Sequence, residues 1–323
     1  MNEALFETFE DTASFSFLGA NVFLYGLLCA GGVLVTLLLF AAMCKKARMT
    51  DGTALVFGAL ALPIGLVVSR ILFCLLDFGF HAVFSPRAAV SFWGGGYSMV
   101  GAIGGAALAA VLTAKNRKVS AAALLDILAV SFFAFIAFER IGESFTELMG
   151  RSRTLVEEVV KNPFFSETDG YDWKLKTYQF EYLTAFVLMF VCFCFYMKNR
   201  SLKGDTALLA LLLFGATQTF WESLRFDSHM RRSFVDMQQI LAAIMMALPA
   251  VLFTLRRTAK EKKNLPLYII IGVLALDVGG IVGIEFMIDR TETSRLLLYA
   301  VYALLLAAPC ALSLINRKKA LNA

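Results

Sequence analysis

The sequence predicts an all-helical, polytopic membrane protein with about nine transmembrane helices. Hydrophobic residues make up 59% of the 323 residues and charged residues only 17%, whereas soluble domains carry about 45–50% apolar and about 25% charged residues. A helix needs roughly 20 mostly apolar residues to cross the hydrocarbon core of a bilayer. Nine stretches meet this requirement, at about 18–43, 54–76, 95–114, 120–139, 180–197, 206–224, 237–255, 266–288 and 295–315.

The charges between these stretches predict the orientation of the helices. Five connecting or terminal segments hold 17 Lys and Arg against three acidic residues, at 45–52, 115–118, 198–205, 256–264 and 316–323. By the positive-inside rule these segments face the cytoplasm, so we expect the N-terminus outside and the C-terminus inside. The longer segment 151–178 then forms a small lobe on the outer face. The net charge of +5 reflects this topology and gives no reason to expect a nucleic-acid partner.

Cysteine and histidine usage gives no sign of a metal centre or of a disulfide framework. All six cysteines lie in or beside apolar stretches, without the spacing of zinc ligands. They fit small, buried hydrophobic side chains. Only two histidines are present. We therefore expect neither a bound metal nor a cofactor.

Polar side chains gather in the outer halves of the first seven predicted helices. Arg70 lies near the outer end of the second helix, Arg140 closes the fourth and Arg225 follows the sixth. A buried charge is costly unless it is paired, so these residues snorkel, pair with carboxylates or line a wet cavity. Guanidinium groups at this depth suit a lipid phosphate, because their planar fork forms paired, charge-assisted hydrogen bonds.

The glycine-rich stretch "FWGGGYSMVGAIGG" (92–105) allows two interpretations. It lacks the Lys-Ser/Thr of a phosphate-binding P-loop and follows no strand, so it does not predict a nucleotide site. Gly101 and Gly105 form a GxxxG pair, which is typical of close helix packing. The run 94–96 at the start of the third helix would also let the backbone approach a lipid headgroup. Both interpretations stay open at this point.

These motifs resemble those of the prolipoprotein diacylglyceryl transferases, bacterial enzymes that lipidate the cysteine of prelipoproteins. The segment "ERIGESFTELMGR" (139–151) is similar to the family signature G-R-x-G-N-F-x-N-G-E-x-x-G-R with one residue missing, and matches it at Arg140, Gly142, Glu147, Gly150 and Arg151. Further similar segments follow in the family's order: "LYGLL" (24–28), "GLVVSR" (65–70), "FWGGGYSMVGAIGG", "LLD" ending at Asp126, "QFEY" (179–182), "QTFWESLR" (218–225) and "MQQ" (237–239).

The resemblance implies a seven-span core over residues 1–255, with its outer lobe at 151–178. Residues 256–323 would add two transmembrane helices and a basic cytoplasmic tail, which the usual family architecture lacks. It also implies a multi-pass protein of the bacterial cytoplasmic membrane with an active site that faces outward. The implied reaction moves the diacylglyceryl group of phosphatidylglycerol, or of a related phospholipid, to a cysteine thiol of a prelipoprotein. The prelipoprotein would be bound through its signal peptide, and glycerol phosphate would be released.

The matching positions imply roles for individual residues. Arg140 and Arg225, together with Arg70, would hold the phosphate, while Glu147 and Glu222 would orient them. Tyr25 would bind the headgroup or assist proton transfer. The candidate catalytic residues are thus Tyr25, Arg140, Glu143, Glu147 and Glu222, and the candidate phospholipid-binding residues are Arg70, Gly95, Gly96, Ser98, Gly142, Gly150, Gln218, Arg225 and Gln239.

Three positions depart from the family pattern and keep an alternative open. Val100 stands where the family has a histidine, Glu143 replaces the signature asparagine, and Gln218 replaces an arginine. Because valine cannot accept a proton, Glu143 is the expected replacement base, with His229 as the second candidate. The alternative function is that of a non-catalytic relative that binds phospholipid or prelipoprotein.

Two further points concern carboxylates elsewhere in the membrane. A secondary transporter would place polar groups in both halves of the bilayer, whereas Asp126 is the only ionisable residue deep on the inner side. A transporter is therefore the third hypothesis, after the transferase and the non-catalytic relative.

Asp277 and Glu285 lie in the eighth helix. They would either pair with arginines of the core or mark a partner-binding helix pair, and the sequence does not decide between the two.

Overall fold

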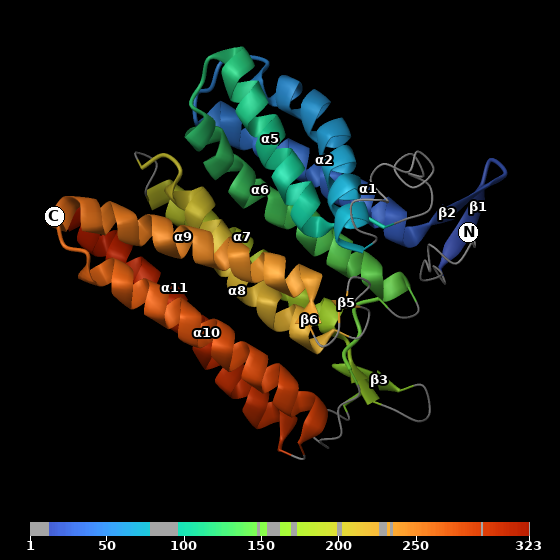
Figure 1. Cartoon of the computed structure of the whole chain (residues 1–323). Coiled ribbons are helices and arrows are strands. Elements are labelled where there is room, and N and C mark those ends of the chain that lie inside the picture. The colour runs from blue at the N-terminus through green and yellow to red at the C-terminus, as the bar shows by residue number, and fades with distance from the viewer. Residues whose placement is uncertain are drawn as a thin grey trace. The chain divides into compact units, whose positions relative to one another are not determined.

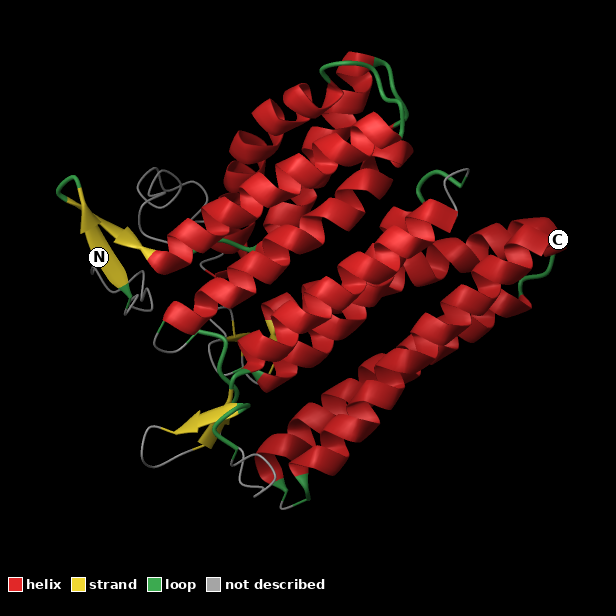
Figure 2. Ribbon diagram, turned by 180° about the vertical axis from the view of Figure 1, so that it is seen from behind, coloured by secondary structure: helices red, strands yellow, loops and turns green. Residues whose placement is uncertain are grey.

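A computed structural model describes most of the chain as helix. It covers residues 13–77, 96–146, 149–153, 162–168, 173–198, 202–225, 231–232, 235–291 and 293–322. Figure 2 shows that helices dominate these residues, and that strands occur only as short pieces. The prediction of an all-helical membrane protein is confirmed, because nine helices within the described residues are long and apolar enough to span a bilayer.

The nine long helices carry the labels of Figure 1. The shortest has 19 residues, which at 1.5 Å per residue is about 28 Å and close to the thickness of a bilayer core. Their bounds are α1 Leu24–Lys46, α2 Thr53–Asp77, α5 Met99–Arg117, α6 Ala121–Gly142, α7 Thr177–Lys198, α8 Asp205–Leu224, α9 Met237–Glu261, α10 Leu265–Arg290 and α11 Arg295–Asn322.

The first transmembrane helix begins six residues later than the sequence suggested. Residues expected to open it form a hairpin of β1 (Ser14–Phe17) and β2 (Ala20–Phe23) instead. Its two-residue turn places Leu18 at φ 51° and Gly19 at φ 81°, the left-handed conformation of the turns that best match strand twist. The short remaining strands also pair as hairpins: β3 (Ser166–Thr168) with β4 (Trp173–Leu175), and β5 (Arg231–Arg232) with β6 (Val235–Asp236).

Polar side chains fix the starts of several helices. The Ser98 Oγ accepts a hydrogen bond from the Gly101 N–H at the start of α5, and Asp236 accepts one from the Gln238 N–H at the start of α9. The first backbone N–H groups of a helix have no partner within it, so such caps stabilise the helix end. The caps therefore hold the backbone at the two ends that carry the motifs "YSMVG" and "DMQQ".

The chain divides into two compact units. The first comprises Met1–Arg151 and Thr177–Ala207, and in it α2 packs on α5, α1 on α6 and α6 on α7. The α2–α5 contact is very close, because a Cβ on Gly101 would lie 2.6 Å from the Ser69 Cα and one on Gly105 would lie 2.7 Å from the Gly65 Cα. Gly101 and Gly105 thus serve helix packing, the first of the two interpretations of the glycine stretch.

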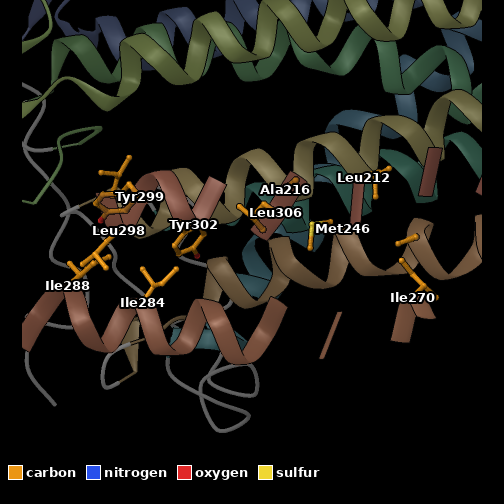
Figure 3. Close-up of a cluster of buried hydrophobic side chains, with 12 residues drawn as sticks. Leu212, Ala216, Met246, Ile270, Ile284, Ile288, Leu298, Tyr299, Tyr302 and Leu306 are labelled. Carbon is orange, nitrogen blue, oxygen red and sulfur yellow. The ribbon is translucent and has the colours of Figure 1, made fainter. Parts of the chain in front are cut away.

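The second unit comprises Ser152–Lys176 and Leu208–Ala323. Its core lies among α8, α9, α10 and α11 (Figure 3). Phe220 of α8 makes edge-to-face contacts with Tyr299 and Tyr302 of α11, with ring centroids 5.8 and 5.9 Å apart. The cluster of buried hydrophobic side chains consists of Leu212, Ala216, Leu224, Met246, Ala250, Ile270, Ile284, Ile288, Leu298, Tyr299, Tyr302 and Leu306.

Gly215 is required by the close approach of α8 to α9. A Cβ at this position would overlap the Met246 backbone nitrogen and lie 2.6 Å from the Ala242 carbonyl oxygen. We expect Gly215→Ala to destabilise the protein by about 1–3 kcal/mol through overpacking and to lower the midpoint of thermal unfolding in detergent. Gly279→Ala in α10 is the matched control, because a Cβ there meets nothing within 4 Å. Equal midpoints for the two variants would contradict this packing.

Candidate active site

The end of α6 carries a buried cluster of charges centred on Arg140. The Arg140 Nη1 donates a hydrogen bond of 2.5 Å to Glu143 Oε1. Its Nε lies 2.8 Å from Glu181 Oε2 of α7 and 3.4 Å from Glu139 Oε2. All four side chains are buried. One guanidinium is thus surrounded by three carboxylates, from α6, from the 3-10 turn Glu143–Phe145 that follows it and from α7, an arrangement that fixes its position.

Arg151 brings a second guanidinium to this cluster. Its Nη1 donates to the backbone oxygens of Glu143, at 2.8 Å, and Met149, at 2.5 Å, and its guanidinium lies 5.1 Å from the centre of the Tyr178 ring. The Arg151 guanidinium is therefore anchored to the backbone beside Glu143 and to the Tyr178 ring.

Tyr25 of α1 joins the cluster through its hydroxyl. The Tyr25 Oη donates a hydrogen bond of 3.2 Å to Glu139 Oε1. Gly142 makes this approach possible, because a Cβ there would lie 3.0 Å from Tyr25 Cδ2. Gly142 thus provides space for Tyr25. A single carboxylate, that of Glu139, contacts both the phenol and Arg140.

Gly150 closes the cluster with a backbone conformation that favours glycine. Its φ is +69°, a region that other residues rarely adopt. A Cβ would also overlap the Glu143 carboxylate and lie 2.8 Å from the Tyr178 Cβ. The backbone N–H of Tyr178 donates to the Gly150 oxygen at 3.0 Å. Gly150 therefore lets the chain pass close to Glu143, whose side chain is fully buried.

A second group of site candidates lies where α2 meets the start of α5. Arg70 is 1% exposed and its Nη1 donates to the Gly96 carbonyl oxygen at 2.8 Å. Ser69 Oγ donates to the Ser98 carbonyl oxygen at 2.6 Å. Tyr97 lies beside Arg70, and partial burial raises the pKa of its phenol while the guanidinium opposes the rise. Arg70 thus holds the backbone that precedes α5.

The second unit holds the remaining candidates at the adjoining ends of α8 and α9. Gln218 Nε2 donates to Glu222 Oε1 at 2.7 Å. Arg225 is buried, and its backbone pairs with that of Ser152. The Gln239 Nε2 donates to Glu285 Oε1 of α10 at 2.7 Å and to Tyr302 Oη of α11 at 2.8 Å. Gln239 is thus held by the two helices that follow residue 255.

The first unit brings several of the expected site residues into two groups. Tyr25, Arg140, Gly142, Glu143 and Gly150 form the group at the end of α6, and Arg70, Gly96 and Ser98 form the group at α2 and α5. Gly95, Glu147 and the second candidate base, His229, lie outside the described residues. Val100, which the motif resemblance sets against the family's histidine, is the second residue of α5 and is half-buried.

Three charged residues complete the Arg140 cluster and were not among the site residues expected from the sequence. They are Glu139, Glu181 and Arg151, and each is an ionisable residue in a motif segment. Glu139 and Glu181 contact Arg140 directly, and Arg151 contacts the backbone of Glu143. Their signal was the presence of unexplained charges at the ends of apolar helices.

Asp126, the carboxylate expected on the inner side, has a structural role. Its two oxygens accept backbone hydrogen bonds from Gly204, at 2.6 Å, and Ala207, at 2.9 Å. These N–H groups belong to the start of α8, where they have no partner within the helix. Asp126 of α6 therefore caps α8. Within the described residues, no group of three His, Cys, Asp or Glu side chains is arranged to hold a metal ion.

The motif segments that form these groups match a known protein family. Residues 12–255 match the sequence model of the prolipoprotein diacylglyceryl transferase family. The chain belongs to this family. The resemblance seen in the motifs is thereby confirmed, and the protein is a multi-pass membrane protein of a bacterial inner-membrane transferase family.

Curated family members match over most of their length at low identity. Phosphatidylglycerol–prolipoprotein diacylglyceryl transferase of Limosilactobacillus reuteri (strain DSM 20016) is 23% identical over 252 residues, which is 76% of this chain and 89% of the relative. The enzyme of the same name from Listeria innocua serovar 6a is 25% identical over 76% of this chain and 88% of its own. That of Clostridioides difficile (strain 630) is 24% identical over 68% and 85%. The family match ends at residue 255, so α10 and α11 lie beyond it.

Proposed function

We propose that this protein transfers the diacylglyceryl group of phosphatidylglycerol to the cysteine thiol of a prelipoprotein. In the reaction the sulfur forms a bond to the glycerol carbon that carries the phosphate, and the bond from that carbon to the phosphate oxygen breaks. The thiol proton passes to a base, and the phosphate leaves with the headgroup as glycerol phosphate. The chemistry requires a thiolate and stabilisation of the charge on the leaving phosphate.

The observation that supports this function most directly is the buried Arg140 cluster. A guanidinium held by three carboxylates is preorganised, and preorganised charge is the most effective way to stabilise a developing anion. From the resemblance to the family motifs, Arg140, Arg225 and Arg70 would each act as ligands of the phosphate. Glu147 and Glu222 would orient these arginines. The headgroup would be bound by the backbone and side chains of Gly95, Gly96, Ser98, Gly142, Gly150, Gln218 and Gln239.

Glu143 is our candidate for the proton acceptor, and Tyr25 would assist it. Glu143 is the fully buried carboxylate of the cluster, and it accepts a hydrogen bond from Arg140. Tyr25 donates a hydrogen bond to Glu139, so its hydroxyl is in position to relay a proton to that carboxylate. Val100 leaves the family's histidine position without a titratable group, which is why the acceptor must come from another residue.

We further propose that the site faces outward in the bacterial cytoplasmic membrane, with the N-terminus outside and the C-terminus in the cytoplasm. The basic segments between the helices support this orientation. In this arrangement residues 1–255 form the transferase core with its outer lobe, and residues 256–323 form an added helix pair. The partners are then the phospholipid in the outer leaflet and the signal peptide of a prelipoprotein.

A transfer assay with the purified protein tests this function. The protein is incubated in detergent micelles containing phosphatidylglycerol, with a lipobox peptide or with the same peptide carrying serine for cysteine. We expect release of glycerol phosphate and formation of a thioether with the cysteine peptide only. Equal release with both peptides would refute transfer to a thiol.

One observation, Val100 in place of the family's histidine, favours a second candidate function. A relative without a working base would bind phospholipid or prelipoprotein through its arginines and transfer nothing. Absence of release, together with saturable binding of phosphatidylglycerol or peptide, would support this non-catalytic role. The two functions thus give opposite results in the transfer assay and the same result in a binding assay.

A further inference from the structure

Two helices beyond the family match converge on one site residue. Gln239 of α9 is 4% exposed, Glu285 of α10 is 2% exposed and Tyr302 of α11 is fully buried. The Gln239 Nε2 lies 2.7 Å from Glu285 Oε1 and 2.8 Å from Tyr302 Oη. The Tyr302 hydroxyl in turn donates to the Thr219 carbonyl oxygen of α8, at 3.3 Å. Three helices therefore meet at this amide, and α8 joins them through Tyr302.

The chemistry of these partners fixes the orientation of the Gln239 amide. The Glu285 Oε1 accepts a hydrogen bond from the Gln239 Nε2, so the amide NH₂ faces Glu285. The Tyr302 hydroxyl gives its proton to Thr219 and accepts from the second N–H of the same NH₂. Both amide donors are then used by α10 and α11. The Gln239 carbonyl oxygen is consequently directed away from Glu285, as a hydrogen-bond acceptor.

The second carboxylate oxygen of Glu285 contacts Arg153, which belongs to the same unit. Arg153 Nη2 lies 3.6 Å from Glu285 Oε2. The Arg153 backbone N–H donates to the Leu224 oxygen at 2.9 Å, and the neighbouring Ser152 pairs with Arg225. Glu285 thus links the amide of Gln239 to the segment that lies against the end of α8. Removing one partner of such a buried network leaves the others unsatisfied.

We propose that Glu285 and Tyr302 are positioning residues that set the headgroup specificity of the transferase by fixing Gln239 as a hydrogen-bond acceptor. The glycerol headgroup of phosphatidylglycerol carries two hydroxyl donors, which suit such an acceptor. The added helices thereby take part in substrate selection and do not merely enlarge the membrane domain. This inference rests on the proposed function, because that function assigns Gln239 to the phospholipid headgroup.

Headgroup preference tests the inference with phosphatidylglycerol and phosphatidylmethanol. The two lipids carry the same phosphate charge, but phosphatidylmethanol has no hydroxyl donor. Preference is measured on the full-length protein as the ratio of transfer kcat/KM values and, independently, as the difference in lipid-induced shift of the unfolding midpoint. We expect the wild type to prefer phosphatidylglycerol. Glu285→Gln is expected to lower that preference about tenfold, the effect of about one hydrogen bond. Glutamine can donate as well as accept, so it allows the Gln239 amide to exchange the positions of its oxygen and its NH₂ group.

Tyr302→Phe and Asp277→Asn complete the design. Tyr302→Phe keeps the packed ring but removes the acceptor, so it is expected to lower the preference as well. Asp277→Asn is the matched control, because Asp277 lies in the same helix at 3% exposure and its Oδ1 has no hydrogen-bond partner among the described residues. Its preference should equal that of the wild type.

The outcomes separate the inference from the proposed function. Equal preference in the wild type and Glu285→Gln would overturn the inference, as would a loss that affects both lipids equally and accompanies a lower unfolding midpoint. Absence of transfer by the wild type would refute the proposed function alone, since the lipid-induced shifts still report headgroup preference. A wild type that neither transfers nor responds differently to the two lipids would overturn both.

Discussion

Replacing Arg140 by alanine is expected to lower the rate of diacylglyceryl transfer by roughly 10²–10³-fold, the usual effect of removing one preorganised group that stabilises transition-state charge. Arg140 donates to Glu143 and lies against Glu139 and Glu181. Its loss removes the proposed phosphate ligand and also leaves three buried carboxylates without this partner. The measurement is glycerol phosphate release under single-turnover conditions, together with the midpoint of thermal unfolding.

A double variant separates lost chemistry from lost stability. Removal of one partner from a buried ion pair typically costs about 3–5 kcal/mol, so Arg140→Ala alone is expected to unfold at lower temperature. Adding Glu181→Gln removes one of the carboxylate charges that contacted Arg140 and should recover part of the unfolding midpoint. Transfer should not recover with it. A rate that rises in step with the midpoint would show that Arg140 acts through stability only.

Replacing Glu143 by glutamine is expected to lower transfer by roughly 10²–10⁴-fold at neutral pH, the range for loss of a general base. The amide keeps the shape of the side chain and can still accept the hydrogen bond from Arg140, but it cannot take the thiol proton. A free cysteine thiol has a pKa of about 8.5. The defect should therefore shrink as the pH approaches about 9, where the peptide thiol ionises without help.

The pH profile distinguishes a base from a binding residue. Glu261→Gln serves as the control, because Glu261 pairs with Arg257 at the C-terminal end of α9 and has no part in the proposed reaction. Its rate should follow the wild type at every pH. A Glu143→Gln defect of constant size across the pH range would argue against proton transfer and for a role in holding Arg140.

The helices were predictable because the bilayer itself sets their length. The expected span at 54–76 corresponds to α2 at Thr53–Asp77, and that at 266–288 to α10 at Leu265–Arg290. The hairpin before α1 was missed, because Phe17, Leu18 and Val22 keep the local sequence apolar whether it is helix or strand. The end of α11 was also placed too early. The helix continues to Asn322 through lysines that are good helix formers but lie beyond the apolar part.

The candidate site was predictable where its contacts are local in the sequence. Arg140 and Glu143 stand three residues apart, on one face of a helical turn. The contacts of Arg140 with Glu181 and of Glu139 with Tyr25 depend on how α7 and α1 are rotated toward α6, and the sequence of a single chain does not contain that angle. The same holds for Glu285. The sequence left open whether it pairs with an arginine or binds a partner, and the structure pairs it with Arg153 and Gln239.

The shared core of α8, α9, α10 and α11 implies that the homology boundary at residue 255 is not a folding boundary. A chain shortened to the length of the matched region would lose Tyr302 and Glu285, which satisfy the amide of Gln239, and would expose Leu212, Met246 and Phe220. Side chains on α8 and α9 therefore depend on the C-terminal helix pair for their packing and hydrogen bonds. A substitution in this core on either helix pair must therefore be accommodated by the other pair.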